Sequence, residues 1–242
     1  MTNLNTNKIF CLLIKNLREL SKKLINRLVL VLKIYVFRDE LELEYKRWIA
    51  DKGDEKLRYD YPNLNENSIV FDVGGFVGDF AAKIHEKYGC EVFVFEPHPE
   101  FYYQCLNRFS NNPKITILNY GLADKDGIFD LTDSVDGSSF SKPQKNNSSI
   151  IRCRCAEFFS VLNEFGITHI NLMKINIEGG EYPLLQHILK HDRASLVGDY
   201  QIQFHNFANE SKLARNKITK ALSKSHKLSW CYNFIWENWE KH

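Results

Sequence analysis

The sequence of 242 residues lacks an apolar run long enough to cross a membrane. Its most apolar stretch, residues 28–37, has ten residues and contains Lys33, whereas a transmembrane helix needs about 20 apolar residues. No short apolar core followed by small residues is present, so we expect no cleavable signal. These absences favour a cytoplasmic protein.

Cysteine is also scarce, and no CxxC spacing occurs. Cys153 and Cys155, the closest pair, would lie on one side of a strand, where they are poorly placed for zinc. We therefore expect reduced thiols, as in the cytosol. The six cysteines are Cys11, Cys90, Cys105, Cys153, Cys155 and Cys231.

The net charge of +2 is unevenly distributed along the chain. Residues 1–38 carry eight Lys or Arg and one Glu, a charge of +7, so the other 204 residues sum to −5. A main domain with this charge lacks the basic footprint of a nucleic-acid-binding protein. We expect no nucleic-acid partner.

Residues 8–37 contain neither Gly nor Pro and predict a helix of about 45 Å. Apolar residues spaced by threes and fours trace one stripe along it. This stripe could pack on the catalytic domain or on a second subunit, making a homo-oligomer. It could instead lie on the inner face of an anionic membrane as a peripheral contact, or span the membrane. We define residues 1–52 as a basic amphipathic helical arm and residues 53–242 as the main domain.

Strand and helix signals alternate along the main domain. Helices of about ten residues between apolar strands predict an α/β, doubly wound, mostly parallel sheet covered on both faces. An additional pair of strands is expected at 127–131 and 150–155, joined by a polar loop. Helices are expected at 40–50, 79–88, 99–109, 156–165, 182–190 and 210–225. The other strands are expected at 69–73, 91–95, 115–118, 171–177, 196–205 and 228–236.

The first of these strands leads into the turn Gly74-Gly75-Phe76-Val77-Gly78. Glycines let the backbone approach a ligand closely, and the helix that follows presents free N–H groups. Glu96 ends the second strand, 22 residues after Gly74. An acid at that distance is placed to accept hydrogen bonds from both hydroxyls of a ribose. The two features predict a nucleoside site.

The sequence lacks the G-x-G-x-x-G pattern of dinucleotide folds, since Phe76 leaves less bare backbone for a pyrophosphate. The carboxylate of Asp72, at the strand end, would also repel nearby phosphates. It suits the cationic groups of S-adenosylmethionine, or a water that bridges to them. The residues therefore favour methyl transfer over hydride transfer.

Four segments in order resemble the FkbM family of methyltransferases, over roughly residues 55–240. The resemblance implies a class I methyltransferase fold, which is Rossmann-like, with S-adenosylmethionine as the cofactor. It also implies methyl transfer to oxygen, often a sugar or polyketide-type hydroxyl, and a link to bacterial surface polysaccharides such as capsules. The segments are VFDVGGFVGD (70–79), VFEP (94–97), GLADKDG (121–127) and MKINIEGGE (173–181).

The resemblance also assigns the cofactor site. The glycines of the first turn would line the methionine and ribose, Glu96 would take the ribose hydroxyls, and residues 119–122 would border the adenine. The full set is Asp72, Gly74, Gly75, Phe76, Gly78, Glu96, Pro97, Asn119, Gly121, Leu122 and Asn176.

The sequence departs from the family pattern at four positions. Gly75 and Phe76 stand where Ala and Asn are usual, Asn176 stands where Asp is usual, and Gln203 stands where many members have Glu. The last two differences remove carboxylates that could bind a metal, so we expect no metal cofactor.

Polar residues gather at the ends of two predicted strands, where a parallel sheet is normally apolar. They predict an acceptor pocket, because buried polar groups need partners. By strand alternation, one face would carry Lys174, Asn176 and Glu178, and another would carry Gln201, Gln203 and His205.

We expect His205 to be the general base, because an imidazole titrates near neutrality, with Glu178 as second choice. Lys174 would pair with Glu178 or with a phosphate of the acceptor. The acceptor would be a nucleotide-activated sugar or a glycan. Substrate contacts are expected from Gln203, Glu181, Ser138, Ser139 and Trp236.

Two other functions remain open. A nicotinamide-dependent oxidoreductase shares the strand, turn and acid. A non-catalytic scaffold in glycan assembly, docked on a membrane through the arm, would explain the lost carboxylates.

Overall fold

The computed structural model describes residues 22, 25, 39–132, 150–207 and 209–242. The chain divides into two units between Arg47 and Trp48, which are considered separately. Most of the expected arm lies outside the described residues, so its role stays a prediction. The helix expected at 40–50 is present as α2 (Glu40–Ala50). No helix within the described residues is long and apolar enough to span a membrane.

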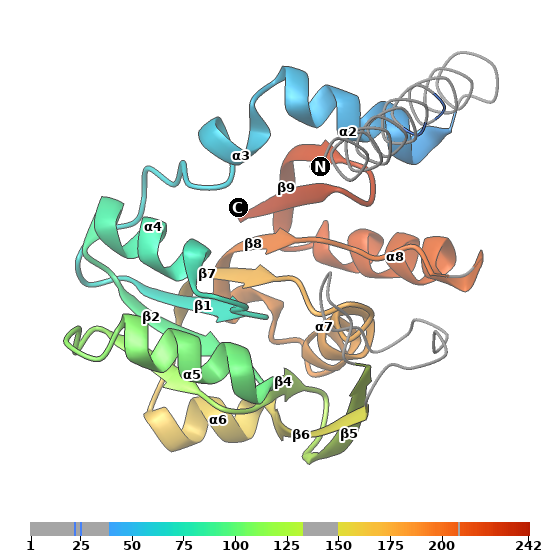
Figure 1. Ribbon diagram of the computed structural model, residues 1–242. Helices are drawn as coiled ribbons and strands as arrows, with labels where there is room; N and C mark the ends of the chain where they lie inside the picture. The colour runs from blue at the N-terminus through green and yellow to red at the C-terminus, as the bar shows by residue number, and fades with distance from the viewer. Residues whose placement is uncertain (1–21, 23–24, 26–38, 133–149, 208) are drawn as a thin grey trace, which may run out of the picture. The chain divides into compact units, whose positions relative to one another are not determined.

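The main unit is built on a seven-stranded sheet with the order β3-β2-β1-β7-β8-β10-β9 (Figure 1). The first five strands in that order run parallel, whereas β10 is antiparallel to both β8 and β9. The strands are β1 (Ile69–Val73), β2 (Glu91–Phe95), β3 (Ile115–Leu118), β7 (Ile170–Ile175), β8 (Val197–Ile202), β9 (His226–Tyr232) and β10 (Trp236–Lys241).

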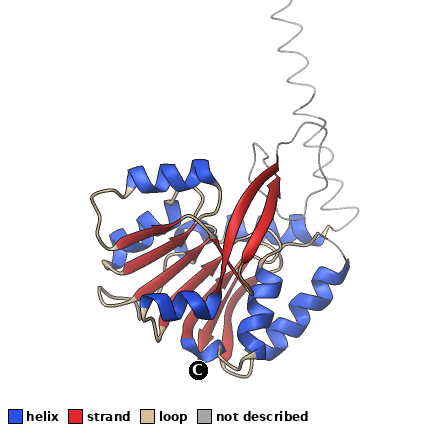
Figure 2. Cartoon of the chain, turned by 90° about the horizontal axis from the view of Figure 1, so that it is seen from below, coloured by secondary structure: helices blue, strands red, loops and turns tan. Residues whose placement is uncertain are grey.

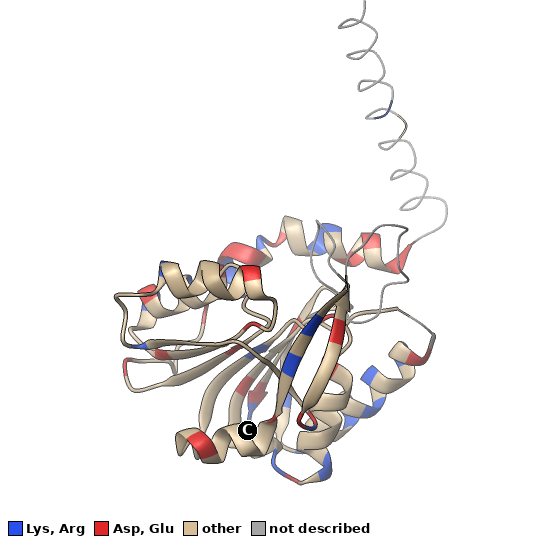
Figure 3. Ribbon diagram, turned by 60° about the horizontal axis from the view of Figure 1, so that its bottom comes forward, with Lys and Arg blue, Asp and Glu red and all other residues tan. Residues whose placement is uncertain are grey.

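Helices cover the sheet on both faces (Figure 2). Side chains alternate along a strand, so Val70 of β1 belongs to an apolar cluster with residues of α4 and α5, while Phe71 belongs to a cluster with residues of α6, α7 and α8. This confirms the expected doubly wound α/β fold. The helices are α3 (Gly53–Lys56), α4 (Asp79–Tyr88), α5 (Pro99–Arg108), α6 (Phe158–Phe165), α7 (Glu181–Lys190) and α8 (Asn209–Leu222). Figure 3 shows acidic and basic residues interspersed along several of them.

A smaller sheet of three strands is inserted after β3, with the order β4-β6-β5. It contains the expected pair, as β5 (Gly127–Thr132) and β6 (Ile150–Glu157), and the short β4 (Gly121–Ala123). The sequence did not predict β4, because three residues are too few to show an alternating pattern.

The prediction of one last strand at 228–236 is wrong. The chain turns after Tyr232 and returns as β10, with Phe234 at a φ of +59° in the turn. The sequence does not predict this turn, because residues 232–235 contain neither Gly nor Pro.

Strands β7 and β8 also end earlier than predicted, at Ile175 and Ile202. Asn176, Glu178 and His205 therefore lie in loops beyond the strands. The alternation argument that placed them on shared strand faces is wrong, although the loops leave the same edge of the sheet.

Candidate active site

The turn after β1 is shaped by close packing between backbones. Gly74 has a φ of +85°, and a Cβ there would lie 2.0 Å from the carbonyl oxygen of Asn176. A Cβ at Gly75 would lie 2.2 Å from Cγ1 of Val94. These glycines are therefore required where the turn fits against its two neighbouring strands, and Asn176 adjoins the turn as expected.

Gly78 and Phe76 complete the turn. Gly78 has a φ of +80°, and a Cβ there would lie 2.5 Å from the ring of Phe109. Phe76 has a φ of +50°, its side chain is 51% exposed, and its ring lies 4.4 Å from that of Phe101. Phe76 thus takes a left-handed conformation in which Asn is the more usual residue.

Glu96 lies at the end of β2 and is bonded to this turn. Its carboxylate accepts hydrogen bonds from the N–H of Phe76 at 2.7 Å and the N–H of His98 at 2.9 Å. Burial raises the pKa of Glu96 to about 7, against the opposing effect of these two bonds. The acid is thus held beside the turn, at the position expected of a ribose-binding residue.

Asp72 and Lys174 form a buried ion pair between β1 and β7. Nζ of Lys174 lies 2.8 Å from Oδ1 of Asp72 and donates to the carbonyl of Gly74 at 2.6 Å. Burial lowers the pKa of Lys174, and the charge of Asp72 opposes that shift. The expectation that Lys174 pairs with Glu178 or with a phosphate is therefore wrong, because neighbouring strands bring Asp72 directly beside it.

The other carboxylate oxygen of Asp72, Oδ2, is buried and has no hydrogen-bond partner among the described residues. An unsatisfied buried carboxylate oxygen is costly unless a donor or a cation meets it. The cationic groups of S-adenosylmethionine would supply such a partner, so the residues fit this cofactor.

A pocket of about 290 Å³ opens beside the turn. It contains three of the expected cofactor residues, Pro97, Gly121 and Leu122. The other eight do not line it: Asp72, Gly74, Gly75, Phe76, Gly78, Glu96 and Asn176 lie in or next to the turn, and Asn119 is exposed. Its walls are mainly apolar, as a purine ring requires. The sequence did not assign the remaining wall to the site, although three family-like segments contribute to it. This wall comprises Phe95, Ala123, Asp124, Lys125, Asp126, Gly127, Ile128, Phe129, Cys155, Ile177, Gly179, Gly180 and Pro183.

His205 lies between two carboxylates, Glu178 from the loop that precedes α7 and Glu181 from the first turn of α7. Its backbone N–H donates to Oε1 of Glu181 at 2.8 Å, and its Nδ1 lies 3.1 Å from the same oxygen. Its Nε2 lies 3.5 Å from Oε1 of Glu178. Burial acts to lower the pKa of His205, but the bonds to Glu178 and Glu181 and their charges outweigh it and raise the pKa to about 9.

The surroundings of His205 fix its orientation further. The hydroxyl of Tyr182 donates to the carbonyl of His205 at 2.7 Å, and the ring stacks on Phe207 at 5.4 Å. Glu181 is fully buried and also accepts from the N–H of Gly179 at 2.7 Å. Its expected role as a substrate contact is corrected, because its carboxylate is occupied by His205 and Gly179.

Trp236 does not form an exposed wall. It is buried in a cluster with Trp48 and Tyr232, and the guanidinium of Arg58 lies 4.2 Å above its ring. Gln203 lies half-buried two residues before His205. Ser138 and Ser139 lie outside the described residues. In the described part of the chain, no group of three His, Cys, Asp or Glu side chains is placed to hold a metal.

The strand order and the turn, acid and loop at the carboxyl ends of β1, β2 and β7 define a class I, Rossmann-like methyltransferase. The family model described as "Methyltransferase FkbM domain" matches residues 72–225. The chain therefore belongs to the FkbM methyltransferase family, and it is an S-adenosylmethionine-dependent methyltransferase.

Solved structures match the chain at low identity and with TM-scores below 0.5. The fibrillarin/Nop5p complex matches with a TM-score of 0.48 and 11% identity, covering 81% of this chain and 82% of that one. SMU.1697c from Streptococcus mutans, solved in complex with S-adenosylhomocysteine, matches at 0.45 and 13%, covering 74% and 91%. An rRNA methylase from Streptococcus thermophilus matches at 0.43 and 14%, covering 74% and 89%. No curated protein matches the chain.

Proposed function

We propose that this methyltransferase acts on a hydroxyl oxygen of a sugar, either in a nucleotide-activated sugar or in a glycan of a bacterial surface polysaccharide such as a capsule. The observation that carries the proposal is the placement of His205 between Glu178 and Glu181. These residues follow β7, which neighbours β1, and β8, the next strand in the sheet. All three strands run parallel, so the residues leave the same edge as the Gly74 turn.

A sugar hydroxyl is a poor nucleophile at neutral pH and gains from a base that removes its proton. In this proposal Nε2 of His205 accepts that proton when its ring is neutral, a form that becomes common as the pH rises towards the pKa of about 9. Glu181 holds Nδ1, which fixes the ring and stabilises the imidazolium that forms, as a carboxylate does in other histidine-based sites. Glu178, 3.5 Å from Nε2, adds to this stabilisation and lies where it can orient the hydroxyl.

When bound, S-adenosylmethionine supplies an activated methyl group on a sulfonium. Asp72, Glu96, Pro97, Gly121 and Leu122 would hold it. Aligning the hydroxyl oxygen with that methyl carbon is itself a large part of the acceleration.

The charges around His205 favour a neutral group next to the reacting hydroxyl. Glu178 and Glu181 place two carboxylates against one imidazolium, and Lys174 is engaged by Asp72. An acceptor phosphate beside His205 would therefore meet a surplus of negative charge. We infer that any phosphate of a nucleotide sugar points away from this cluster.

The proposal is tested by incubating the purified chain with labelled S-adenosylmethionine and a panel of neutral sugars, nucleotide sugars and oligosaccharides. We expect S-adenosylhomocysteine and a labelled sugar to form together, and His205→Ala to reduce turnover steeply with little change in cofactor affinity. Cofactor binding without transfer to any sugar would oppose the proposal and favour a scaffold, and tight binding of a nicotinamide dinucleotide would favour an oxidoreductase.

A further inference from the structure

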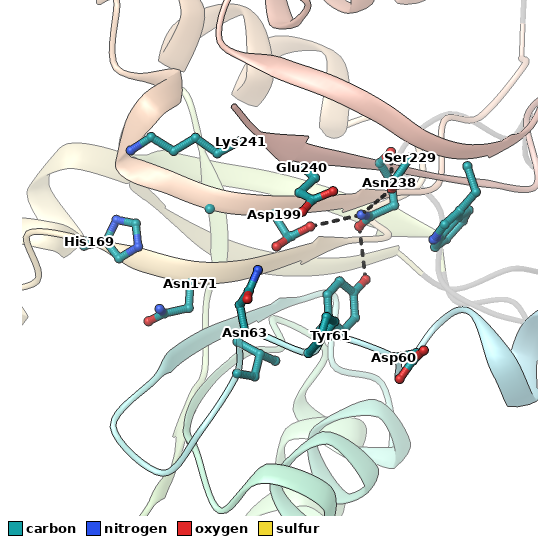
Figure 4. A pocket seen from close by; sticks show the side chains of 14 residues that line it. Asp60, Tyr61, Asn63, His169, Asn171, Asp199, Ser229, Asn238, Glu240 and Lys241 are labelled. Carbon is teal, nitrogen blue, oxygen red and sulfur yellow. Dashed lines mark hydrogen bonds between the residues drawn. The ribbon is translucent and has the colours of Figure 1, made fainter.

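A second pocket, of about 460 Å³, lies at the opposite edge of the sheet from the Gly74 turn (Figure 4). It opens where β7 and β8 begin, at Asn171 and Gly198, and the β9–β10 hairpin and residues 60–64 form its other walls. Because β1 and β7 run parallel, the pocket lies about one strand length from the turn, ~16 Å for five residues. None of the candidate active-site residues lines it.

Asp199 is held at the centre of this pocket by a chain of hydrogen bonds. The side-chain amide of Gln201 donates to the hydroxyl of Tyr61, which donates to Oδ1 of Asn238 at 3.1 Å. The amide of Asn238 then donates to Oδ1 of Asp199 at 3.0 Å and to Oγ of Ser229 at 2.8 Å (Figure 4). Each of these hydrogen-bond donors has an acceptor within the network, so the Asp199 carboxylate is fixed in position before a ligand binds.

The surroundings of Asp199 destabilise its charged carboxylate. It lies directly opposite Glu240 in the antiparallel β8–β10 pair, and like charges facing each other across a sheet are destabilising. Burial raises the pKa of Asp199 to about 6, with Asn238 and Lys227 opposing the shift and Glu240 adding to it. Further hydrogen-bond donors would stabilise this carboxylate.

The pocket also offers donors. Oδ1 of Asn171 accepts the N–H of Ile69 at 2.9 Å, so its amide presents N–H groups to the pocket. Trp230 adds part of an indole ring to the wall. A ligand here must therefore both donate and accept hydrogen bonds, as a hydroxyl does.

The charges around the pocket favour a neutral ligand. Two of its three carboxylates pair with lysines outside the lining, Asp60 with Lys87 at 3.1 Å and Glu240 with Lys227 at 3.3 Å, and the ammonium of Lys241 donates to the carbonyl of Ser195 at 2.8 Å. The pKa of His169 is lowered by burial and by Lys241, so its ring is neutral at pH 7. A simple cation would leave the Asn171 donors unused.

We propose that this pocket binds a neutral saccharide unit, whose hydroxyls donate to Asp199 and accept from Asn171 while its ring lies against Trp230. A strand-end acid holds the two hydroxyls of a ribose in the same way. The volume falls within the range of small-ligand sites, about 300–1,000 Å³. The pocket stands apart from methyl transfer, and it would anchor a second unit of a glycan.

The test is saturation-transfer NMR and calorimetric titration of the full chain, without cofactor, against neutral hexoses, N-acetylhexosamines and their disaccharides at millimolar concentrations. Inorganic phosphate and spermidine are the charged probes. We expect at least one saccharide to bind, and Asp199→Asn to weaken it about tenfold through loss of charge-assisted hydrogen bonds. Asn keeps the shape and an acceptor for Asn238, so the variant should fold.

Asp60→Asn is the matched control, because the same change is made in the lining at a carboxylate that bonds Lys87 at 3.1 Å. It should leave the affinity unchanged. The proposal is overturned if no saccharide of the panel binds, if phosphate or spermidine binds more tightly, or if Asp199→Asn and Asp60→Asn have equal effects. Because no methyl transfer is measured, the result is independent of the proposed function.

Discussion

Nζ of Lys174 lies 2.8 Å from Oδ1 of Asp72, and the two side chains are 5% and 0% exposed. This ion pair joins β1 to β7 directly below the Gly74 turn, whose carbonyl also accepts from Lys174. The pair leaves Oδ2 of Asp72 buried and without a hydrogen-bond partner among the described residues. The same contact therefore joins two strands of the sheet and lies next to the proposed cofactor site.

Replacing Lys174 with Met should lower the free energy of unfolding by about 3–5 kcal/mol, because it leaves the Asp72 carboxylate buried without its partner. Urea denaturation measures this change. The double variant Asp72→Asn/Lys174→Met removes both charges and should recover much of the loss. If the single and double variants are equally stable, the pair is not coupled as described.

Glu96→Gln should weaken binding of S-adenosylhomocysteine by about tenfold to a hundredfold, since a charged hydrogen-bond acceptor is lost. The NH₂ group of the Gln side chain would also face one of the two backbone N–H groups that now donate a hydrogen bond to Glu96. Isothermal titration measures the affinity, with thermal unfolding of the ligand-free variant as the control. An unchanged affinity would remove Glu96 from the ribose site.

The pH dependence of wild-type Glu96 gives a separate prediction. Its pKa is raised from 4.5 to about 7, so its contribution to the stability of the ligand-free protein is full below pH 4.5 and is lost as the pH rises through about 7. Cofactor affinity should change in the opposite direction, increasing as the carboxylate ionises around its pKa of about 7. Titrations on both sides of this pKa with equal affinity throughout would contradict the assignment.

The raised pKa of His205 predicts both a stability profile and a rate profile. A cation held by two carboxylates stabilises the fold fully below its unfolded pKa of 6.5, and the contribution is lost as the pH rises through about 9. The stability difference between the wild type and His205→Gln should therefore shrink as the pH rises from 6.5 to about 9 and stay small above it. If His205 is the base, turnover should rise over the same interval. A rate that is already constant at neutral pH would instead favour Glu178.

Glu181→Gln and Glu178→Gln separate the two carboxylates of the cluster. Glu181 touches both the backbone N–H and Nδ1 of His205, so its loss should lower the pKa of the imidazole, misorient the ring and reduce turnover. Its pH–rate midpoint should move below about 9, with cofactor affinity unchanged. Glu178→Gln leaves the Nδ1 contact intact and should preserve the ring orientation. Identical profiles for the two variants would show that Glu181 does not position His205.

Much of the fold follows from local sequence. Strands β1, β2 and β3 have the predicted bounds, because each is a short apolar run ended by a turn. The turn at Phe234 was missed because its left-handed residue is not glycine. Glycine and proline mark many turns in a sequence, so a turn that contains neither residue is not predicted from the sequence.

The candidate site is less predictable, because its contacts depend on how loops fold and on strand register. Glu181 and His205 are 24 residues apart, and nothing in either segment shows that one caps the other. The Asp72–Lys174 pair follows from the register of β1 against β7, which the sequence does not specify. The sequence therefore predicted the residue types and the edge of the sheet, but not their pairing.

The most direct test of the account is NMR of the product formed from S-adenosylmethionine that carries a ¹³C-labelled methyl group. With the sugar that supports turnover, we predict a single new methyl ether carbon and one S-adenosylhomocysteine for each label transferred, both strongly reduced in His205→Ala. A label on nitrogen or carbon, or no transfer to any sugar by protein that binds the cofactor, would contradict the proposed methylation of a sugar hydroxyl.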